Sequence, residues 1–300
     1  MPLPNDYLTY PHRKRGFDHD HYDWNPETKR PPLRLKSGAK AAAFIVVPLE
    51  FFPLNPPAEP FKHPGAMKTP YPDLRHYTTR DYGNRIGVYR ILKVLAEFGM
   101  EATFAINAEV AKRYPPLIDT VSQAGHEIAA HGVSTAHIHH EGLSAQAETQ
   151  LVEQCRSTFP EATTWLSPAR NESYLTTQLL AQAGYNVLLD WEADQRPLSF
   201  RTESGNITCL PLMHELSDVK LMVDNRQQAD AWADQILEAA AFHVADHQRA
   251  GAQCFGFTLT PYVVGQPFRI HALRRLVDGL SHMEGLEVAA AGNIPALFEE

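Results

Sequence analysis

The sequence has little of three features that would point to particular classes of protein. It holds three cysteines in 300 residues, Cys155, Cys209 and Cys254, without the paired spacing of a metal motif or a full set of disulfide partners. It has no apolar run of membrane-spanning length and no signal-peptide core within residues 1–34. Basic residues are not in excess, because 27 Lys and Arg stand against 35 Asp and Glu. We therefore expect reduced thiols, a cytoplasmic protein, and neither a membrane nor a nucleic-acid partner.

Apolar strands alternate with helical segments through most of the chain. Residues 41–47 form a continuous apolar run, which is typical of a strand buried on both faces. Further strands are predicted at 102–106, 127–130, 164–166, 186–190, 207–212, 220–223, 254–260 and 286–289. Helices are predicted at 86–98, 108–123, 144–158, 174–183, 227–249, 269–281 and near Pro295. About seven strand–helix units predict an α/β fold with a parallel barrel or a strongly twisted sheet.

Two segments fall outside this alternation. Residues 1–40 have no sustained period and predict an extended N-terminal arm that lies on this subunit or a neighbour, before a single domain at 41–300. Residues 50–84 form a long Pro-rich connection, and loops of such length inside a compact domain are usually functional.

Polar side chains follow most of the predicted strands. In a parallel barrel the carboxyl ends of the strands meet at one face, so these groups could share a cavity. Glu50 directly follows an apolar strand, where a carboxylate is costly unless it is paired or useful. A Glu and a His facing one substrate can divide general-base and general-acid work, as amide hydrolysis requires. The other candidates are Phe51, His131, Ser167, Arg170, Glu172, Asp190, Trp191, Glu215, Asp218 and Tyr262.

Four histidines crowd into residues 131–140. They could form a metal site, but zinc enzymes need three fixed protein ligands, and His137, His139 and His140 fall in a predicted loop. We therefore predict that His139 and His140 are surface residues and that His131 carries the function of this segment. Trp191 could stack on a ring or serve as a core aromatic, and Glu172 could equally be a helix cap or a solvated loop residue.

From about residue 41 onward the chain resembles the polysaccharide deacetylase superfamily, which shares the NodB homology domain, and within it the allantoinase-like branch. The matching segments are DYGNRIGVYR at 81–90, AGHEIAAHG at 124–132, WLSP at 165–168 with Glu172, DW at 190–191, ELSD at 215–218 and PYVVGQPFR at 261–269. The resemblance implies a deformed parallel (β/α) barrel that hydrolyses carbon–nitrogen bonds other than peptide bonds. It also implies a homo-oligomer.

The resemblance also assigns roles, and this chain departs from four of them. In metal-dependent relatives a general base and a metal ligand are adjacent aspartates, and a His-x-x-x-His segment adds two ligands. Here the aligned residues are Glu50 and Phe51, then His131 and Thr135. The usual arginine of the fourth-strand motif aligns with Ser167, with Arg170 nearby, and the usual late-strand histidine aligns with Thr260.

Three hypotheses remain open. The first is a metal-independent hydrolase of an amide, a ureide or an acetylated sugar. In it Glu50 activates water, His131 protonates the leaving nitrogen or orients the substrate, and Arg170 or backbone donors stabilise the oxyanion. The second is a deacetylase assisted by a metal such as zinc, with His131 and nonstandard ligands such as His137, His214 or Glu50. The third is a non-catalytic relative that binds a carbohydrate or ureide in the cleft or serves as an assembly subunit. Each hypothesis has the same predicted substrate-binding residues, which are Phe51, Ser167, Glu172, Asp190, Trp191, Glu215, Asp218 and Tyr262.

Overall fold

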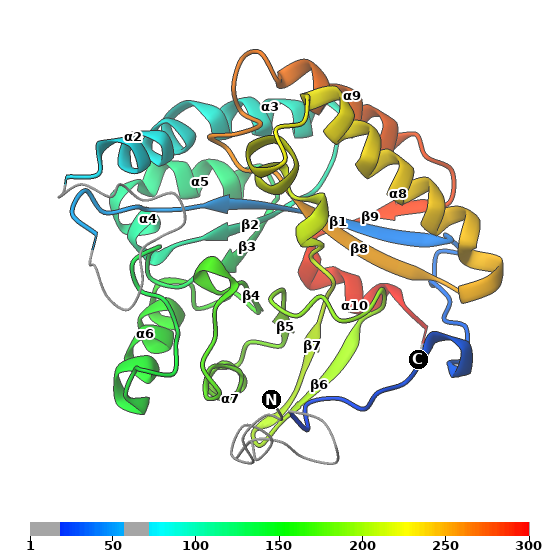
Figure 1. Cartoon of the computed structure of the whole chain (residues 1–300), viewed down its shortest axis with the longest axis horizontal. Helices are drawn as coiled ribbons and strands as arrows, with labels where there is room; N and C mark the ends of the chain where they lie inside the picture. Colours follow the sequence, from blue (N-terminus) through cyan, green and yellow to red (C-terminus); the bar gives the residue numbers. More distant parts are fainter. Residues whose placement is uncertain (1–18, 57–71, 300) are drawn as a thin grey trace, which may run out of the picture.

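A computed structural model describes residues 19–56 and 72–299 of the chain. A mostly parallel sheet curls through its centre in the order β6-β7-β5-β4-β3-β2-β1-β8, and β9 pairs with β1 (Figure 1). Its strands are β1 (Ala41–Leu49), β2 (Thr103–Ile106), β3 (Glu127–Ala130), β4 (Thr164–Trp165), β5 (Val187–Leu188), β6 (Leu198–Thr202), β7 (Gly205–Cys209), β8 (Gln253–Thr258) and β9 (Leu286–Val288). This confirms the α/β fold and the deformed parallel barrel, which is an open half-barrel with β6 antiparallel to β7.

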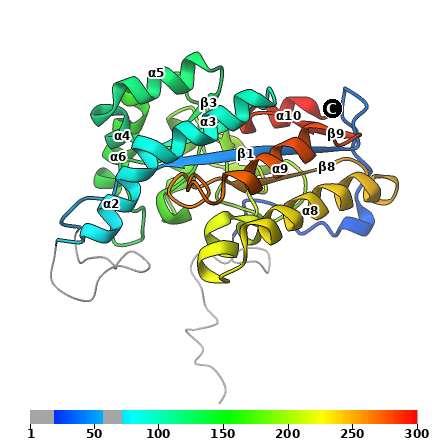
Figure 2. The ribbon, with the colours of Figure 1, turned by 90° about the horizontal axis from the view of Figure 1, so that it is seen from above.

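Helices cover the outside of this sheet. In Figures 1 and 2, α3, α9 and α8 lie side by side along β1. The α-helices are α2 (Leu74–Tyr82), α3 (Val88–Glu97), α4 (Ala108–Arg113), α5 (Pro115–Gln123), α6 (Ala145–Thr158), α7 (Thr176–Gln182), α8 (Ala229–Ala250), α9 (Ile270–Ser281) and α10 (Ile294–Leu297). Shorter turns of helix are η1 (Glu27–Lys29), η2 (Gly83–Gly87), η3 (Pro168–Arg170), η4 (His214–Leu216), η5 (Val219–Asp224) and η6 (Ala291–Asn293). None of the helices in the described ranges combines the length and apolar character needed to cross a bilayer.

Strand β1 is the centre of the core and is buried on both faces, as its apolar run predicts. Ala43, Ile45 and Val47 pack with the apolar faces of the outer helices. Phe44 and Val46 face the inside of the curl. Burial of both faces leaves little room for a polar side chain along the strand, so polar groups collect after its last residue.

The strand register then aligns the residues that follow each strand. Leu49 of β1 lies opposite Ile106 of β2, which lies opposite Ala130 of β3. The row continues from Ala130 to Trp165 of β4 and from Trp165 to Leu188 of β5. The next residue of each strand is therefore carried to one edge of the sheet, and this edge presents Glu50, Asn107 and His131.

Three expectations about the elements are wrong. The segment 220–223 is not a strand but part of η5, because a short apolar run fits a buried helical turn as well as a strand. The connection 50–84 is not irregular to its end, because Asp73 caps α2 by accepting a hydrogen bond from the His76 backbone. The predicted helix 108–123 is two helices that meet at Tyr114, where Pro115 begins the second.

The described part of the predicted N-terminal arm lies on the same chain. Arg201 of β6 bonds to Asp23 at 3.0 Å, and Leu33 and Leu35 form bridges to Gly251 and Phe298. Residues 1–18 of the arm fall outside the described residues, so the division at residue 40 stays a prediction.

Candidate active site

Glu50 and His131 meet at the carboxyl edge of the sheet. Each follows the last residue of its strand, β1 and β3, with β2 between them. The His131 side chain is 4% exposed, and its Nε2 lies 3.7 Å from Oε1 of Glu50, whose side chain is 18% exposed. A carboxylate and an imidazole at this distance can exchange a proton after a small movement or through one water.

The His131 ring is held in one orientation. Its Nδ1 lies 2.8 Å from the Leu166 carbonyl oxygen. Because a carbonyl only accepts hydrogen bonds, Nδ1 carries the hydrogen and Nε2 is left to face Glu50. The N–H of the same peptide unit, on Ser167, donates to both carboxylate oxygens of Asp190 at 3.0 Å. One peptide unit therefore connects His131 to Asp190.

Arg80 of α2 completes this group, and the sequence reasoning missed it. Its Nε lies 3.3 Å from Glu50 Oε2, and the residue is 5% exposed. The guanidinium lies 4.8 Å from the ring centroid of Tyr262 and 5.2 Å from that of Phe52. The signal that could have found it was Asp73, a helix cap seven residues earlier in a segment that we interpreted as a connection.

Two buried asparagines fix the backbone around the pair. Asn84 Nδ2 donates to the Glu50 carbonyl at 2.9 Å. Asn107, at the end of β2, accepts a bond from the Phe51 backbone N–H at 2.9 Å and donates to the His131 carbonyl. These side chains fix the backbone at Glu50 and at His131, which follow two strands separated by β2.

The positions that hold a metal in relatives do not fit one here. The Phe51 ring lies beneath the Arg113 guanidinium, 4.1 Å away, and the Thr135 hydroxyl donates to the Phe51 carbonyl at 2.9 Å. A phenyl ring and a hydroxyl already used as a donor are poor ligands for zinc. Across 19–56 and 72–299, no three His, Cys, Asp or Glu side chains are placed to hold an ion. The alternative set of His131, His137 and His214 is therefore not assembled, and His137 bonds instead to Ser134 at 2.8 Å.

Comparison with known proteins finds a family model that matches part of the chain. Residues 69–188 match the family model described as polysaccharide deacetylase. No curated protein matches it by sequence.

Among solved structures, the fold is similar to that of a Mycobacterium smegmatis protein described as a polysaccharide deacetylase, with 22% identity, a TM-score of 0.71, and coverage of 89% of this chain and 95% of that one. The Puue allantoinase has 19% identity and a TM-score of 0.74, with coverage of 96% and 97%. A Pseudomonas aeruginosa protein also described as a polysaccharide deacetylase has 19% identity and a TM-score of 0.73, with the same coverage. The predicted resemblance is thus confirmed, and these similarities show the fold.

Asp218 lies beside Thr260, which follows the end of β8. The Asp218 carboxylate is fully buried and accepts bonds from the Thr260 backbone N–H at 2.6 Å and from the Thr260 hydroxyl at 2.7 Å. Burial raises the pKa of Asp218 to about 7, although these hydrogen bonds act in the opposite direction and lower the pKa. Burial likewise raises the pKa of Tyr262, and the negative charges of Glu50 and Asp218 add to that effect. Thr260, where relatives carry a histidine, is thus committed to Asp218.

Arg170 lies in a different group from Arg80. Its Nη1 donates to Glu192 at 3.0 Å and its Nη2 to the Leu212 carbonyl. Arg80, rather than the predicted Arg170, is the guanidinium against Glu50.

The remaining predicted residues divide by exposure. Ser167 is fully buried and accepts a bond from the Trp165 indole, whereas Glu215 is exposed on η4. Glu172, Asp190 and Trp191 line a hollow together with Arg170.

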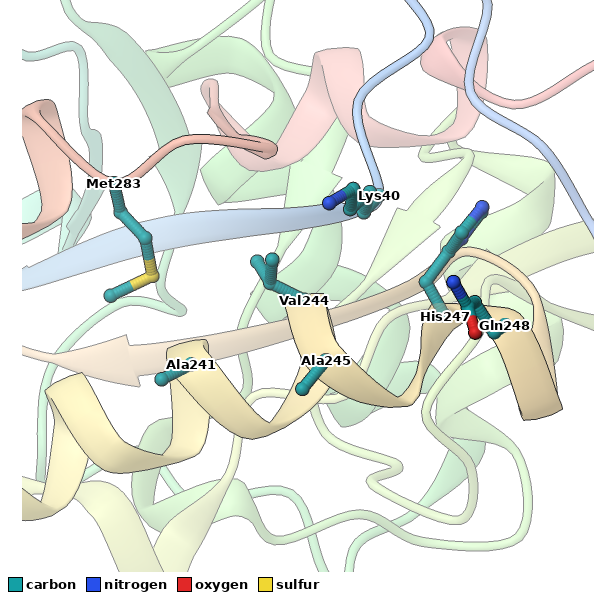
Figure 3. Close-up of a pocket in the computed structure, with 7 residues that line it drawn as sticks. All are labelled: Lys40, Ala241, Val244, Ala245, His247, Gln248 and Met283. Carbon is teal, nitrogen blue, oxygen red and sulfur yellow. The ribbon is translucent and has the colours of Figure 1, made fainter.

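Another hollow, of about 300 Å³, lies beside Lys40 and His247 near the start of β1, at the opposite end of that strand from Glu50 (Figure 3).

The prediction that His139 is a surface residue is wrong. His139 is fully buried, and its Nδ1 lies 3.0 Å from Oε1 of Glu148, which is 1% exposed. The hydroxyls of Ser173 and Thr176 donate to the same carboxylate. Polar residues in a loop were assumed to face solvent, but His139 bonds to Glu148 inside the protein and links the loop after His131 to α6. His140 is partly buried.

Proposed function

We propose that this chain hydrolyses a carbon–nitrogen bond outside peptides, through Glu50 and His131 and without the metal of its relatives. The observation that carries the proposal is the 3.7 Å approach of the Glu50 carboxylate to His131 Nε2, with Arg80 on the other carboxylate oxygen. The family supports a hydrolase of this class, and an acetylated amine, an acetylated sugar or a ureide is the substrate that the proposal names.

The geometry supports a simple sequence of proton movements. Glu50 accepts a proton from a water molecule as the water oxygen bonds to the carbonyl carbon of the substrate. The proton passes from Glu50 to Nε2 of His131, while Nδ1 keeps its hydrogen and donates it to the Leu166 carbonyl. His131 then gives the proton to the leaving nitrogen as the carbon–nitrogen bond breaks, and the products are an acid and an amine.

Arg80 supplies the positive charge of the site. It orients the Glu50 carboxylate, and its guanidinium can face negative charge that develops on the substrate oxygen. Its contacts with the faces of the Phe52 and Tyr262 rings keep it in place. We assign this role to Arg80 because its guanidinium contacts Glu50, whereas that of Arg170 bonds to Glu192 and Leu212.

The test is turnover of a panel of acetylated amines, N-acetylglucosamine oligomers and allantoin. We expect Glu50→Gln and His131→Ala to abolish whatever activity the wild type shows. The matched controls are Glu203→Gln and His282→Ala, which change exposed residues away from the sheet edge and should retain activity. Equal activity of Glu50→Gln and Glu203→Gln would rule the mechanism out.

The second candidate is a protein that binds a carbohydrate or ureide without turning it over. Two hydrogen bonds favour it: the Thr135 hydroxyl donates to the Phe51 carbonyl, and the Thr260 hydroxyl donates to Asp218. In relatives these two positions supply a metal ligand and an acid. A panel that gives no turnover while members raise the melting temperature would establish this function.

A further inference from the structure

The hollow beside the start of β1 lies far from the proposed catalytic pair. It has a volume of about 300 Å³ and opens between the C-terminal half of α8, the residue before β1 and the segment that joins α9 to β9 (Figure 3). Lys40 directly precedes β1 and Glu50 directly follows it, so the length of the strand, about 30 Å, separates the hollow from Glu50. An occupant of this hollow is therefore not the substrate of the proposed hydrolysis.

One side of the hollow is apolar. Ala241, Val244 and Ala245 line it from α8, and Met283 lines it from the segment before β9. Figure 3 shows the Val244 side chain pointing from α8 toward β1, with the Met283 side chain entering from the opposite side. The small alanine side chains leave space open, and the flexible thioether of methionine adapts to irregular apolar shapes. This side suits a short aliphatic chain.

The polar groups of the hollow carry no negative charge. They come from Lys40, His247 and Gln248, whereas Glu284, an exposed acid of the neighbouring segment, is not among the lining residues. Within residues 19–56 and 72–299, the exposed Lys40 ammonium has no ion pair and the buried Nδ1 of His247 has no hydrogen-bond partner. A buried nitrogen without a partner is costly, so an occupant that bonds to it gains affinity.

Nearby negative charge is already engaged. Asp246 of α8 accepts bonds from Arg249 at 2.6 and 2.8 Å. The Ala250 carbonyl, at the end of α8, accepts a bond from Arg196. These contacts reduce the negative potential that an acid and the carboxyl end of a helix would otherwise present. The charge that the hollow presents is that of Lys40, which favours an anionic occupant.

We propose that this hollow binds a monocarboxylate with an aliphatic chain of about eight carbons. The carboxylate accepts hydrogen bonds from Lys40 and His247, and the chain lies against Val244 and Met283. The chain length follows from the volume. At roughly 30 Å³ for each non-hydrogen atom, the share of one water molecule in the liquid, a hollow of about 300 Å³ accommodates about ten atoms, as many as octanoate has.

Calorimetric titration with octanoate tests the proposal, with 1-octanol and octylammonium as ligands of the same chain and different charge. We expect about one octanoate to bind to each chain, about tenfold more tightly than octanol, because charge-assisted hydrogen bonds distinguish it. Octylammonium should bind more weakly than octanol, since Lys40 repels it. Butyrate should bind at least about tenfold more weakly than octanoate, because it buries fewer methylenes. Equal binding of the three eight-carbon ligands, or adsorption of many octanoates to each chain, would overturn the proposal.

Lys40→Met tests the charge of the hollow. The variant keeps an unbranched side chain, so we expect the octanoate affinity to fall about tenfold while octanol binds as it does to the wild type. Lys93→Met, at an exposed lysine of α3, is the matched control and should bind octanoate normally. A Lys40→Met variant with the octanoate affinity of the wild type contradicts the assigned role of the ammonium.

Ala245→Leu tests the space. It fills the hollow from an exposed position of α8 and should weaken octanoate and octanol alike by about tenfold or more, whereas Ala231→Leu, at another exposed alanine of the same helix, should leave both unchanged. Both positions are exposed, so we expect folded variants. Glu50→Gln should also bind octanoate normally, so the fate of the proposed hydrolysis does not affect this test. Undiminished octanoate binding in Ala245→Leu would place the ligand elsewhere and refute the proposal.

Discussion

The contact between Arg80 and Glu50 leads to a prediction that needs no knowledge of the substrate. Arg80→Met removes the guanidinium and keeps an unbranched side chain, so Glu50 loses this cation at the end of an apolar strand. The side chains are 6% and 18% exposed, which limits screening by water. We expect the variant to be destabilised through the lost ion pair as well as through the lost contacts with Phe52 and Tyr262.

The magnitude follows from the distance. Coulomb's law at 3.3 Å with an effective dielectric constant of about 20 gives roughly 5 kcal/mol before desolvation. Desolvation and side-chain ordering oppose this, and close, poorly solvated pairs retain a coupling of about 2 kcal/mol.

A double-mutant cycle isolates that coupling. Urea unfolding of the wild type, Arg80→Met, Glu50→Gln and the double variant gives four free energies of unfolding, and the ring contacts of Arg80 cancel in the cycle. The control cycle uses Arg274 and Glu97, an exposed pair at 3.0 Å, for which about 0.5 kcal/mol or less is expected. A coupling for Arg80 and Glu50 no larger than that of the control would refute the reasoning.

Three further predictions concern the surroundings of the site. Burial raises the pKa of Asp218 to about 7. The protonated carboxyl therefore contributes fully to the free energy of unfolding below the pKa of the unfolded chain, and this contribution is lost as the pH rises through 7. The unfolding free energy of the wild type should fall by about 3 kcal/mol between pH 5 and pH 8, and that of Asp218→Asn should not show this fall. A variant with the pH profile of the wild type would contradict the prediction. Phe51→Asp combined with Thr135→His should introduce zinc binding, measured as about one equivalent of metal by mass spectrometry. A double variant that binds no zinc would contradict the assignment of these positions. Glu148→Gln should lower the unfolding free energy by about 3 kcal/mol by breaking the buried pair with His139, and a loss below about 1 kcal/mol would show the pair to be dispensable.

The sequence predicts the fold well because its strongest signals are local. The apolar run that became β1 shows burial on both faces, and the polar residue after it marks the carboxyl edge of the sheet. From strand order alone, Glu50 and His131 were expected at one edge, and the register carries both there. Weaker local signals failed at 220–223, where four residues fit two structures equally.

The sequence could not predict the partners of these residues, which depend on tertiary contacts. Arg80 of α2 reaches Glu50 across 30 positions through a tertiary contact, and no local pattern encodes that approach. Asn107 has an ordinary strand-end position, and its bonds to Phe51 and His131 follow only from the register of three strands. His139 was assigned to the surface because it falls in a loop, and its buried partner Glu148 on α6 could not be foreseen from the sequence.

The central claim is that Glu50 and His131 hydrolyse a carbon–nitrogen bond without a metal. The direct measurement is turnover of the best substrate in the panel by protein stripped with a chelator and shown to be metal-free by mass spectrometry. We predict the same rate before and after stripping, with loss of activity in Glu50→Gln. Activity that disappears on stripping and returns with added zinc would contradict the account.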